Sequence, residues 1–515
     1  MKTTTKKVFL SAMTIALSLF AVQAGTITVG TPGGAGGVEV KGTWTKGSTV
    51  IVNDHVIIQA GQSLTIEDGV TVEIADTTLK IEFIVLGNLY CKGTANSPIN
   101  ITVSANKIPS NVATTRPFPG LWGGIMCDLT CKEVLMLHTN IKYYGAATTN
   151  NSPSVLLKLY KAAAGETVPF MNFRNHVDGK LVVMNSTFSN GVDDGIYIEG
   201  GKVIFAYNKV YQNGSTGGDA TNLKAGTIAD LCYNMYYSQN TNAFKLSNSG
   251  SRSPQCVAVV YNNTIVNTGW RRPTIKGGSV WYEAGVVGKT YNTLFLNCRY
   301  GIKTDGKADA ASTGDYNYYY GNTQNTVNNF NTPTPGLLAH GANDVYGTTA
   351  GANDPMLVNY PLSTDTLNSK FDMSWDFHPK SGSPLINKGT TTITRNFGTA
   401  GSGITIQSVE YLSPAPSTTV GAFAVSTVGV NDLKTNQFGI FPNPVSTTLN
   451  ITLDSNNSAK SLVVYNETGV KVIDQLIDYN STSLTVPVAH LNAGVYTLSI
   501  IYSDNSQNSK TFIKE

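Results

Sequence analysis

A repeat of 23 to 30 residues is the feature that most limits how this 515-residue chain folds. Five segments share an asparagine, a run of apolar residues and an amide residue five positions after the asparagine. The leading asparagines are Asn185, Asn208, Asn234, Asn262 and Asn292, and their amide partners are Asn190, Asn213, Gln239, Asn267 and Asn297. A unit this short cannot bury its own apolar face, so successive units must stack on one another.

The stacked units predict an all-β fold, a parallel β-helix (solenoid). Its coils would be about 4.8 Å apart, with amide side chains stacked at the bends. The N-terminal part agrees, because STVIVNDHVIIQ at 48–59 and QSLTIEDGVTVEI at 62–74 alternate apolar and polar residues between turns that contain glycine. The 50 glycines and the low charged fraction of 13% also favour short strands joined by tight turns.

The two ends of the chain differ from the repeats. Residues 1–24 combine three lysines with a short apolar run and have the layout of a secretory signal peptide. No other stretch reaches the roughly 18 apolar residues that a membrane helix needs, so we expect no transmembrane segment. Residues 424–437 are a polar linker, and residues 438–515 alternate between turn signals as in a small β-sandwich. We expect an exported monomer.

Cysteine and histidine place few constraints on function. Six cysteines in an exported chain permit disulfide bonds, and Cys127 with Cys131 is the best local candidate, although spacing does not determine the pairing. The six histidines never pair at the spacing of metal ligands, and no nucleophile elbow or phosphate-binding loop occurs.

Alignment of the segments that follow the bends predicts a row of lysines. An apolar column, which points into the core, contains Ile198, Leu223, Phe244, Ile275 and Ile302. The next column, which points outward because strand residues alternate sides, contains Glu199, Lys224, Lys245, Lys276 and Lys303.

Like charges stacked at strand spacing repel one another by about 1 kcal/mol per pair even in water. Between residues 193 and 307 there are 12 Lys and Arg against 7 Asp and Glu, a difference of +5. This excess favours a polyanion, and for an exported solenoid we expect an acidic polysaccharide. No motif that reads nucleic acid occurs. The alternative is that the lysines are simply solvated.

Acidic residues precede the same column. Asp193, Asp194 and Asp219 would lie on adjacent coils, and calcium, which prefers carboxylate and amide oxygens, would suit them together with Asn240. The alternative is an ordinary turn, which Asp before Gly also signals.

These columns predict a lysine base. Removal of a proton next to a uronate carboxylate needs a base that is partly neutral, and crowding by Lys224 and Lys276 would lower the pKa of Lys245. We therefore assign catalysis to Lys245 and Lys224, assisted by calcium. Substrate binding is assigned to Arg271, Arg272, Lys276, Lys303 and Trp270. A loop anchor would explain the tryptophan equally well.

Several motifs resemble the pectate-lyase-like β-helix superfamily. They are GLWGGI at 120–125, SWDFHPKSGSPLINKG at 374–389, the Phe244-Lys245-Leu246 segment and Asp193-Asp194-Gly195. The last two are similar to the lysine-base segment and the paired calcium aspartates of calcium-dependent pectate lyases. The resemblance covers about residues 25–423 and implies a right-handed parallel β-helix there. Its last two segments imply a polysaccharide lyase.

The C-terminal region resembles the sorting domain of type IX secretion. Phe-Pro-Asn-Pro at 441–444, Gly-Val-Tyr-Thr-Leu at 494–498 and the terminal SKTFIKE carry this resemblance. It implies transport across the outer membrane by the type IX machinery, and secretion or attachment at the cell surface.

Two other functions fit the same residues. A glycoside hydrolase would use two of the carboxylates Asp193, Asp194, Glu199 and Asp219, and would leave the lysines without a role. A non-catalytic adhesin or glycan-binding protein would use the basic row only to bind. A new conjugated double bond would identify a lyase, and new reducing ends without it would identify a hydrolase.

Overall fold

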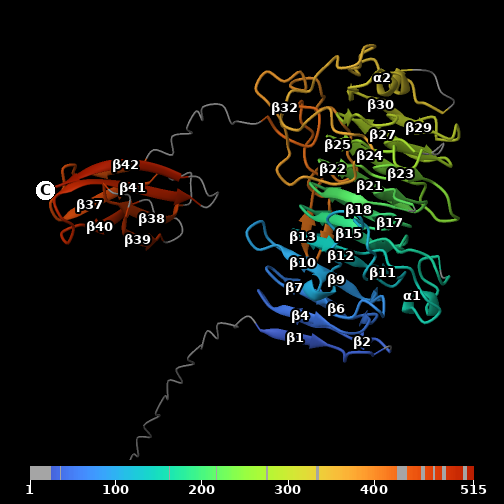
Figure 1. Ribbon diagram of the computed structural model, residues 1–515, viewed down its shortest axis with the longest axis horizontal. Coiled ribbons are helices and arrows are strands. Elements are labelled where there is room, and N and C mark those ends of the chain that lie inside the picture. The colour runs from blue at the N-terminus through green and yellow to red at the C-terminus, as the bar shows by residue number, and fades with distance from the viewer. Residues whose placement is uncertain are drawn as a thin grey trace, which may run out of the picture. The chain divides into compact units, whose positions relative to one another are not determined.

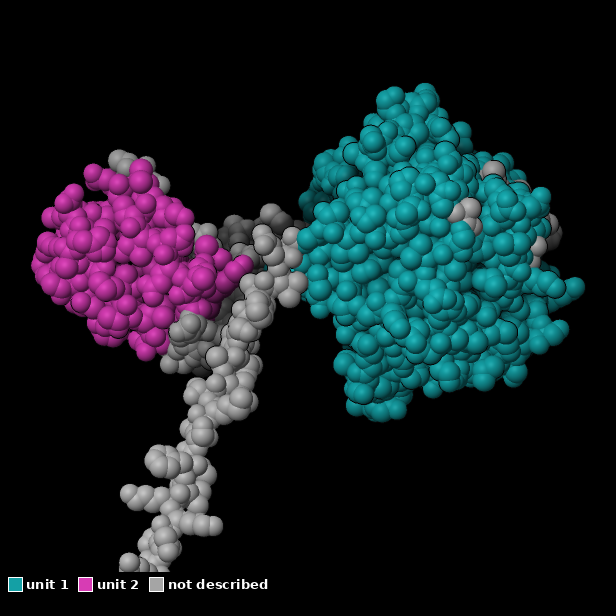
Figure 2. Space-filling model, turned by 90° about the horizontal axis from the view of Figure 1, so that it is seen from below, with its two compact units in different colours: residues 1–426 teal, residues 427–515 magenta. Residues whose placement is uncertain are grey.

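The computed structural model describes residues 25–515, with gaps at the ranges given at the end of this paragraph, and these residues form two compact units. Unit 1 is residues 1–426 and unit 2 is residues 427–515, drawn in teal and magenta in Figure 2. The predicted signal peptide and most of the predicted linker lie outside the described residues. The gaps are residue 35, residue 162, residue 216, 274–276, 332–335, 426–437, 454–458, 468–469, 478–482 and 503–506.

Unit 1 is a parallel β-solenoid of about 11 turns, as the repeats predict (Figure 1). Each turn contributes one strand to each of three sheets, so every third strand of the chain is a neighbour in space. The first sheet contains β1 (Thr26–Val29), β4 (Thr49–Val52), β7 (Thr71–Ile74), β10 (Ile99–Val103), β13 (Thr139–Lys142), β16 (Thr187–Gly191), β19 (Lys209–Asn213), β22 (Met235–Tyr237), β25 (Thr264–Val266), β28 (Leu294–Leu296) and β31 (Tyr318–Tyr320).

The other two sheets repeat this arrangement. The second sheet contains β2 (Val38–Glu39), β5 (Val56–Ile58), β8 (Phe83–Val85), β11 (Ile125–Cys127), β14 (Met171–Phe173), β17 (Ile196–Ile198), β20 (Thr221–Leu223), β23 (Phe244–Ser247), β26 (Val280–Glu283) and β29 (Ile302–Thr304). The third contains β3 (Gly42–Trp44), β6 (Ser63–Glu67), β9 (Asn88–Lys92), β12 (Glu133–Leu137), β15 (Lys180–Met184), β18 (Gly201–Ala206), β21 (Thr227–Cys232), β24 (Val257–Tyr261), β27 (Val287–Tyr291) and β30 (Thr313–Asp315).

Stacked apolar side chains fill the solenoid. The strands are in register, so one inward position of the first sheet repeats on every coil. Aromatic rings stack within this core, with centroids 4.8 Å apart for Phe295 and Tyr319 of the first sheet and 3.9 Å apart for Phe188 and Phe170, which precedes β14. The repeated position holds Ile27, Val50, Val72, Ile101, Ile141, Phe188, Val210, Tyr236, Ile265, Phe295 and Tyr319.

An amide ladder fixes one bend, but in a different alignment from the predicted one. Asn234 Oδ1 accepts from the Asn208 backbone N–H at 2.9 Å, and Asn263 Oδ1 accepts from the Asn234 N–H at 2.8 Å. The predicted column that used Asn262 is wrong by one residue there, because Asn262 has φ +50° and occupies the preceding left-handed position, as Tyr233 does. Each ladder residue satisfies a buried backbone N–H of the coil before it.

Residues 357–423 return along the outside of the solenoid. They include β32 (Leu357–Asn359), β33 (Asp376–Pro379), β34 (Ile404–Ile406) and β35 (Val409–Tyr411). Ile404 and Ile406 pack on outward side chains of the third sheet. The buried carboxylate of Asp230 anchors this segment, since it accepts hydrogen bonds from the backbone N–H groups of Asn396 and Phe397 and from the Ser413 hydroxyl. Three short helical segments complete the unit: the 3-10 turn Ala105–Lys107, α1 (Pro153–Leu156) and α2 (Gln324–Asn331).

Unit 2 consists of two small antiparallel sheets that enclose one apolar core, in agreement with the predicted sandwich. The core includes Leu449, Leu462, Val464, Leu498 and Phe512, all fully buried. The sheets are β36 (Gly439–Phe441), β37 (Thr448–Thr452) and β40 (Ser483–Pro487), and β39 (Lys471–Leu476), β38 (Ala459–Tyr465), β41 (Gly494–Tyr502) and β42 (Gln507–Lys514).

The cysteines of the solenoid form no disulfide bond. The predicted Cys127–Cys131 disulfide is wrong, because all six cysteines are buried free thiols. Within the described residues no helix is long and apolar enough to cross a membrane.

Candidate active site

The three predicted aspartates and two of the predicted lysines, Lys224 and Lys245, line one open pocket of about 400 Å³ on the second sheet. The middle residues of three consecutive strands form its floor, namely Tyr197 on β17, Asn222 on β20 and Lys245 on β23. The bends before these strands and the loop before β26 supply the rim. The full lining is Lys161, Asp193, Asp194, Tyr197, Gly217, Asp219, Asn222, Lys224, Lys245 and Arg272.

The aspartates lie on adjacent coils, as predicted. Asp194 Oδ1 accepts from the Asp219 backbone N–H at 2.9 Å, and its Oδ2 accepts from the Asn222 amide at 2.8 Å. Asp219 Oδ1 accepts from the Asn242 amide at 2.7 Å. Burial and the nearby charge of Asp194 raise the pKa of Asp219 to about 7, against the favourable charge of Lys245. Asp219 is therefore a carboxyl group that keeps a proton near neutral pH.

Asp193 lies at the outer edge of the same group. Its Oδ2 accepts from the Thr167 hydroxyl at 2.6 Å. Burial, and then the charge of Asp194, raise its pKa above the ordinary aspartate value. Glu199, the fourth predicted carboxylate, forms an ion pair with Arg174 at 3.2 Å and is absent from the pocket lining.

The predicted single row of lysines is wrong in register. Lys245 faces Asn222 on one neighbouring strand and Trp281 on the other, and Lys303 follows Trp281. Lys224 is therefore diagonal to Lys245, two residues out of line with it. Lys245 and Lys303 share a row with Trp281 between them, while Lys276 lies outside the described residues.

Lys224 and Lys245, the two predicted lysines in the pocket, differ in pKa. Burial, and then the charge of Lys245, lower the pKa of Lys224 to about 8. Burial alone would lower the pKa of Lys245 as well, but the carboxylates of Asp219, Glu283 and Asp194 outweigh burial and raise it. The predicted lowering of the Lys245 pKa is thus wrong, and the lysine that is neutral part of the time is Lys224.

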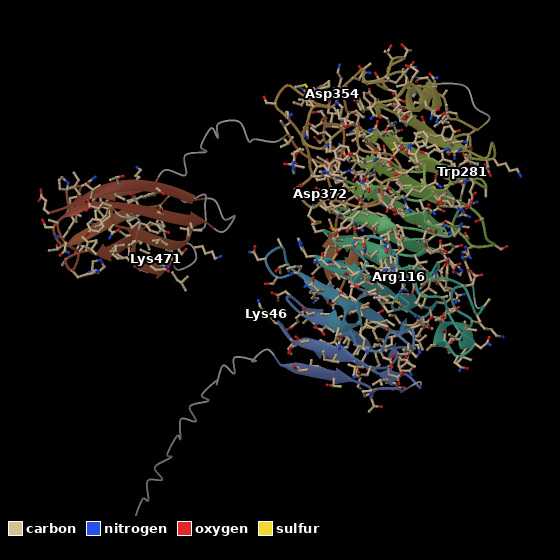
Figure 3. The ribbon with its side chains drawn as sticks, in the orientation of Figure 1. Lys46, Arg116, Trp281, Asp354, Asp372 and Lys471 are labelled. Carbon is tan, nitrogen blue, oxygen red and sulfur yellow. The ribbon has the colours of Figure 1, made fainter. Side chains whose placement is uncertain are left out.

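Glu283 is a site residue that the sequence analysis missed. Its Oε1 lies 3.5 Å from Lys245 Nζ, and its Oε2 accepts from the Trp281 indole N–H at 2.8 Å. Trp281 is labelled in Figure 3 on the side of the solenoid where Figure 1 labels β17, β23 and β29. Alternation along β26 places Trp281 and Glu283 on the same outward face, but that face is recognised only when the register is correct.

The predicted substrate-binding residues have different environments. The Arg271 guanidinium donates to the carbonyls of Ser238, Gly214 and Asn213 at 2.6 to 2.8 Å, and burial lowers its pKa to about 10. It anchors a loop. Trp270 donates its indole N–H to the Asn297 carbonyl at 2.8 Å, which is also an anchoring contact.

Of the other two predicted substrate-binding cations that the structure describes, one lines the pocket and the other does not. Arg272 is exposed and lines the pocket. Lys303 is only 2% exposed, and its ammonium lies 4.1 Å from the Tyr300 ring centroid. Arg272 is therefore the predicted substrate-binding residue that stays on the pocket rim with the two lysines.

Fold and pocket together define a β-solenoid protein with a pocket lined by acidic and basic residues on one sheet and a separate antiparallel C-terminal unit. Residues 439–515 of that unit match the secretion system C-terminal sorting domain family. The domain indicates export by type IX secretion to the cell surface or outside, in agreement with the C-terminal motifs. A search of curated proteins finds no match to this chain.

Proposed function

We propose that the solenoid binds an acidic polysaccharide in the pocket and cleaves it by β-elimination. The observation that carries this proposal is the pairing of Lys224, with a pKa of about 8, and Asp219, with a pKa of about 7, in one open pocket. A base and an acid that both titrate near neutral pH are the two groups that the reaction needs. Lys245 and Arg272 supply positive charge for the uronate carboxylate.

In the proposed reaction, neutral Lys224 Nζ takes the proton from the carbon that bears the carboxylate. The electrons of that C–H bond form the carbon–carbon double bond while the bond to the glycosidic oxygen breaks. Protonated Asp219 donates its proton to that oxygen. The products are one unsaturated chain end and one saturated end, and proton exchange with water restores both side chains.

The order of the two pKa values determines the pH profile. The base must be neutral and the acid protonated, although the pKa of the acid is the lower of the two. Only a minority of molecules then holds the reactive form, and that fraction is greatest between the two pKa values. We therefore expect a bell-shaped kcat/KM profile centred between pH 7 and 8.

Calcium at Asp193, Asp194 and Asp219 stays a prediction, and the donor set fits it poorly. The Asp194 carboxylate already accepts three N–H groups, from Gly218, Asp219 and Asn222. Among the described residues no three His, Cys, Asp or Glu side chains gather closely enough to hold a metal ion. Activity that survives a chelator would support the metal-free mechanism, whereas loss that calcium restores would return the aspartates to a metal-binding role.

A glycoside hydrolase is the second candidate, favoured by Asp219. A carboxyl group with a pKa of about 7 beside the ionisable Asp193 and Asp194 is also the arrangement of an acid and its partner carboxylate in glycoside hydrolysis. The two functions differ in product. Elimination creates a conjugated double bond, and hydrolysis creates a new reducing end without one.

The experiment is an assay of the secreted protein on polygalacturonate, alginate, hyaluronan and heparin, with detection of double bonds and reducing ends. Lys224→Ala should lower kcat by roughly 10²- to 10⁴-fold, the usual contribution of a general base. Lys202→Ala, an exposed lysine on β18 of the third sheet, is the matched control and should leave kcat unchanged. Turnover of none of these polymers, with retention on a polyanion, would instead indicate a binding protein.

A further inference from the structure

The outward row of the second sheet is open over only three strands. In register, the row runs through Ile57, Ile84, Met126, Asn172, Tyr197, Asn222, Lys245, Trp281 and Lys303. Of these, Tyr197, Asn222 and Lys245 line the pocket. At about 4.8 Å per coil, the first and last of the three are about 10 Å apart along the solenoid.

A wall closes the N-terminal end of this open stretch. The segment 149–164, which includes α1, covers Ile84 and Met126, and Tyr160 packs edge-on against Tyr197 with ring centroids 5.1 Å apart. The segment is anchored at Ser154, whose backbone N–H and hydroxyl donate to the buried Glu82 carboxylate at 2.9 and 2.6 Å. Tyr160 is only 3% exposed, so the wall is packed against the sheet.

The pocket floor also ends after Lys245. Trp281 and Lys303, the next two residues of the row, are absent from the pocket lining. Beyond them the chain at Leu337 pairs antiparallel with Lys303, and the Leu338 N–H donates to the Ile302 carbonyl at 2.9 Å, so this backbone lies beside β29 at the edge of the sheet.

From this geometry, and given the polysaccharide function proposed above, we propose that the pocket takes the end of an acidic glycan chain, or a short oligosaccharide, and not the middle of a polymer. A polymer that follows the sheet along the solenoid needs free passage at both ends of the row. The wall formed by segment 149–164 stops it at Tyr197, where Tyr160 packs. A chain end fills the pocket without crossing this wall.

The first test is the product pattern. Wild-type protein is incubated with polygalacturonate, alginate, hyaluronan and heparin and with size series of their oligosaccharides. We expect short products from the first minutes, a slow fall in viscosity, and turnover of short oligosaccharides at least as fast as that of polymer per chain end. Early fragments of all sizes with a rapid fall in viscosity would overturn the proposal and leave the lyase function intact.

The second test removes the wall. Ala147 pairs with Thr167, and Thr148 exchanges backbone hydrogen bonds with Gly165 and Glu166, so the two ends of segment 149–164 lie together. A variant with this segment replaced by Gly-Gly, plus Ile84→Thr and Met126→Thr on the uncovered strands, should gain at least tenfold in internal cleavage. Tyr160→Ala is a milder variant that should shift the products in the same direction. Unaltered products from a folded shortened variant would show that the wall does not select chain ends.

The third test is independent of turnover. Calorimetry with the same polymers and size series should give one protein bound per accessible chain end whatever the chain length. A stoichiometry that grows with chain length overturns end binding, even where cleavage occurs. If no polymer is cleaved but length-independent binding is seen, the lyase function fails and end recognition stands, and if nothing binds, both fail.

Discussion

Substitution of Lys245 by methionine tests the division of roles between the two lysines. Lys245 is diagonal to Lys224 on the adjacent strand, where the Cα atoms are about 7 to 8 Å apart. At an effective dielectric constant of about 20, two charges at that distance repel by about 2 kcal/mol, or roughly 1.5 pH units. Lys245→Met removes that repulsion, so the pKa of Lys224 should rise from its value of about 8.

The same change acts on the acid. The charge of Lys245 lowers the pKa of Asp219, so its removal raises that pKa above about 7. Both limbs of the kcat/KM profile should then move to higher pH by roughly 1 to 1.5 units. At pH 7 the neutral fraction of Lys224 falls from about 10% to about 0.3%, while the protonated fraction of Asp219 nearly doubles. The net loss is roughly 15-fold in kcat/KM, and it is recovered in alkaline buffer.

The assay is the rate of double-bond formation at substrate concentrations well below KM over the range from pH 5 to about 10, since kcat/KM reports the ionisations of the free enzyme. Lys202→Met controls for the loss of a surface charge. If the optimum stays where it is and kcat/KM falls at every pH by a hundredfold or more, Lys245 is the base. The assignment to Lys224 is then wrong.

Three further predictions concern stability and export. Asp219→Asn should raise the free energy of unfolding at pH 8 by up to about 4 kcal/mol and change it little at pH 4. The reason is that burial raises the folded pKa of Asp219 to about 7, so the cost of ionising this carboxyl group in the folded protein grows between these two pH values. Chemical denaturation at both pH values measures the difference. Asn234→Ala should cost about 2 to 3 kcal/mol in urea unfolding, because it leaves the buried Asn208 N–H without its acceptor; a cost below 0.5 kcal/mol would contradict the ladder. A chain that ends before residue 439 should keep a folded solenoid but accumulate inside the outer membrane, as cell fractionation would show.

The architecture was predictable because the signals that carry it are periodic. A repeat of 23 to 30 residues with alternating apolar positions leaves few solutions besides a stacked coil, and the structure has about 11 such turns. The sorting domain was predictable for a different reason, since its motifs are local in sequence. Pairing of Cys127 with Cys131 was not, because short spacing does not determine whether two buried thiols form a bridge.

Part of the pocket lining was predictable, but the register of the lysines was not. The bends before β17 and β20 bring Asp194 and Asp219 onto adjacent coils, and the prediction needed only the order of the coils. The lysine row needed the alignment of residues within the coils. Phe244 and Leu246 both point inward, so the alternating pattern is the same whether Leu223 is aligned with the first or the second. A slip of one residue would expose the core, whereas a slip of two leaves every residue on its own face.

That slip of two residues has a chemical consequence. With Leu223 beside Leu246, Lys224 and Lys245 are diagonal, and Lys245 is within reach of the Glu283 carboxylate. Had Lys224 and Lys245 been stacked directly, their ammonium groups would have been equally crowded, and this crowding would not have separated their pKa values. The diagonal arrangement gives one lysine a carboxylate partner and leaves the other buried against Tyr197, 5.2 Å from its ring centroid. The geometry of the fold, and not the number of basic residues, therefore explains why the pKa of Lys245 is raised while that of Lys224 is lowered to about 8.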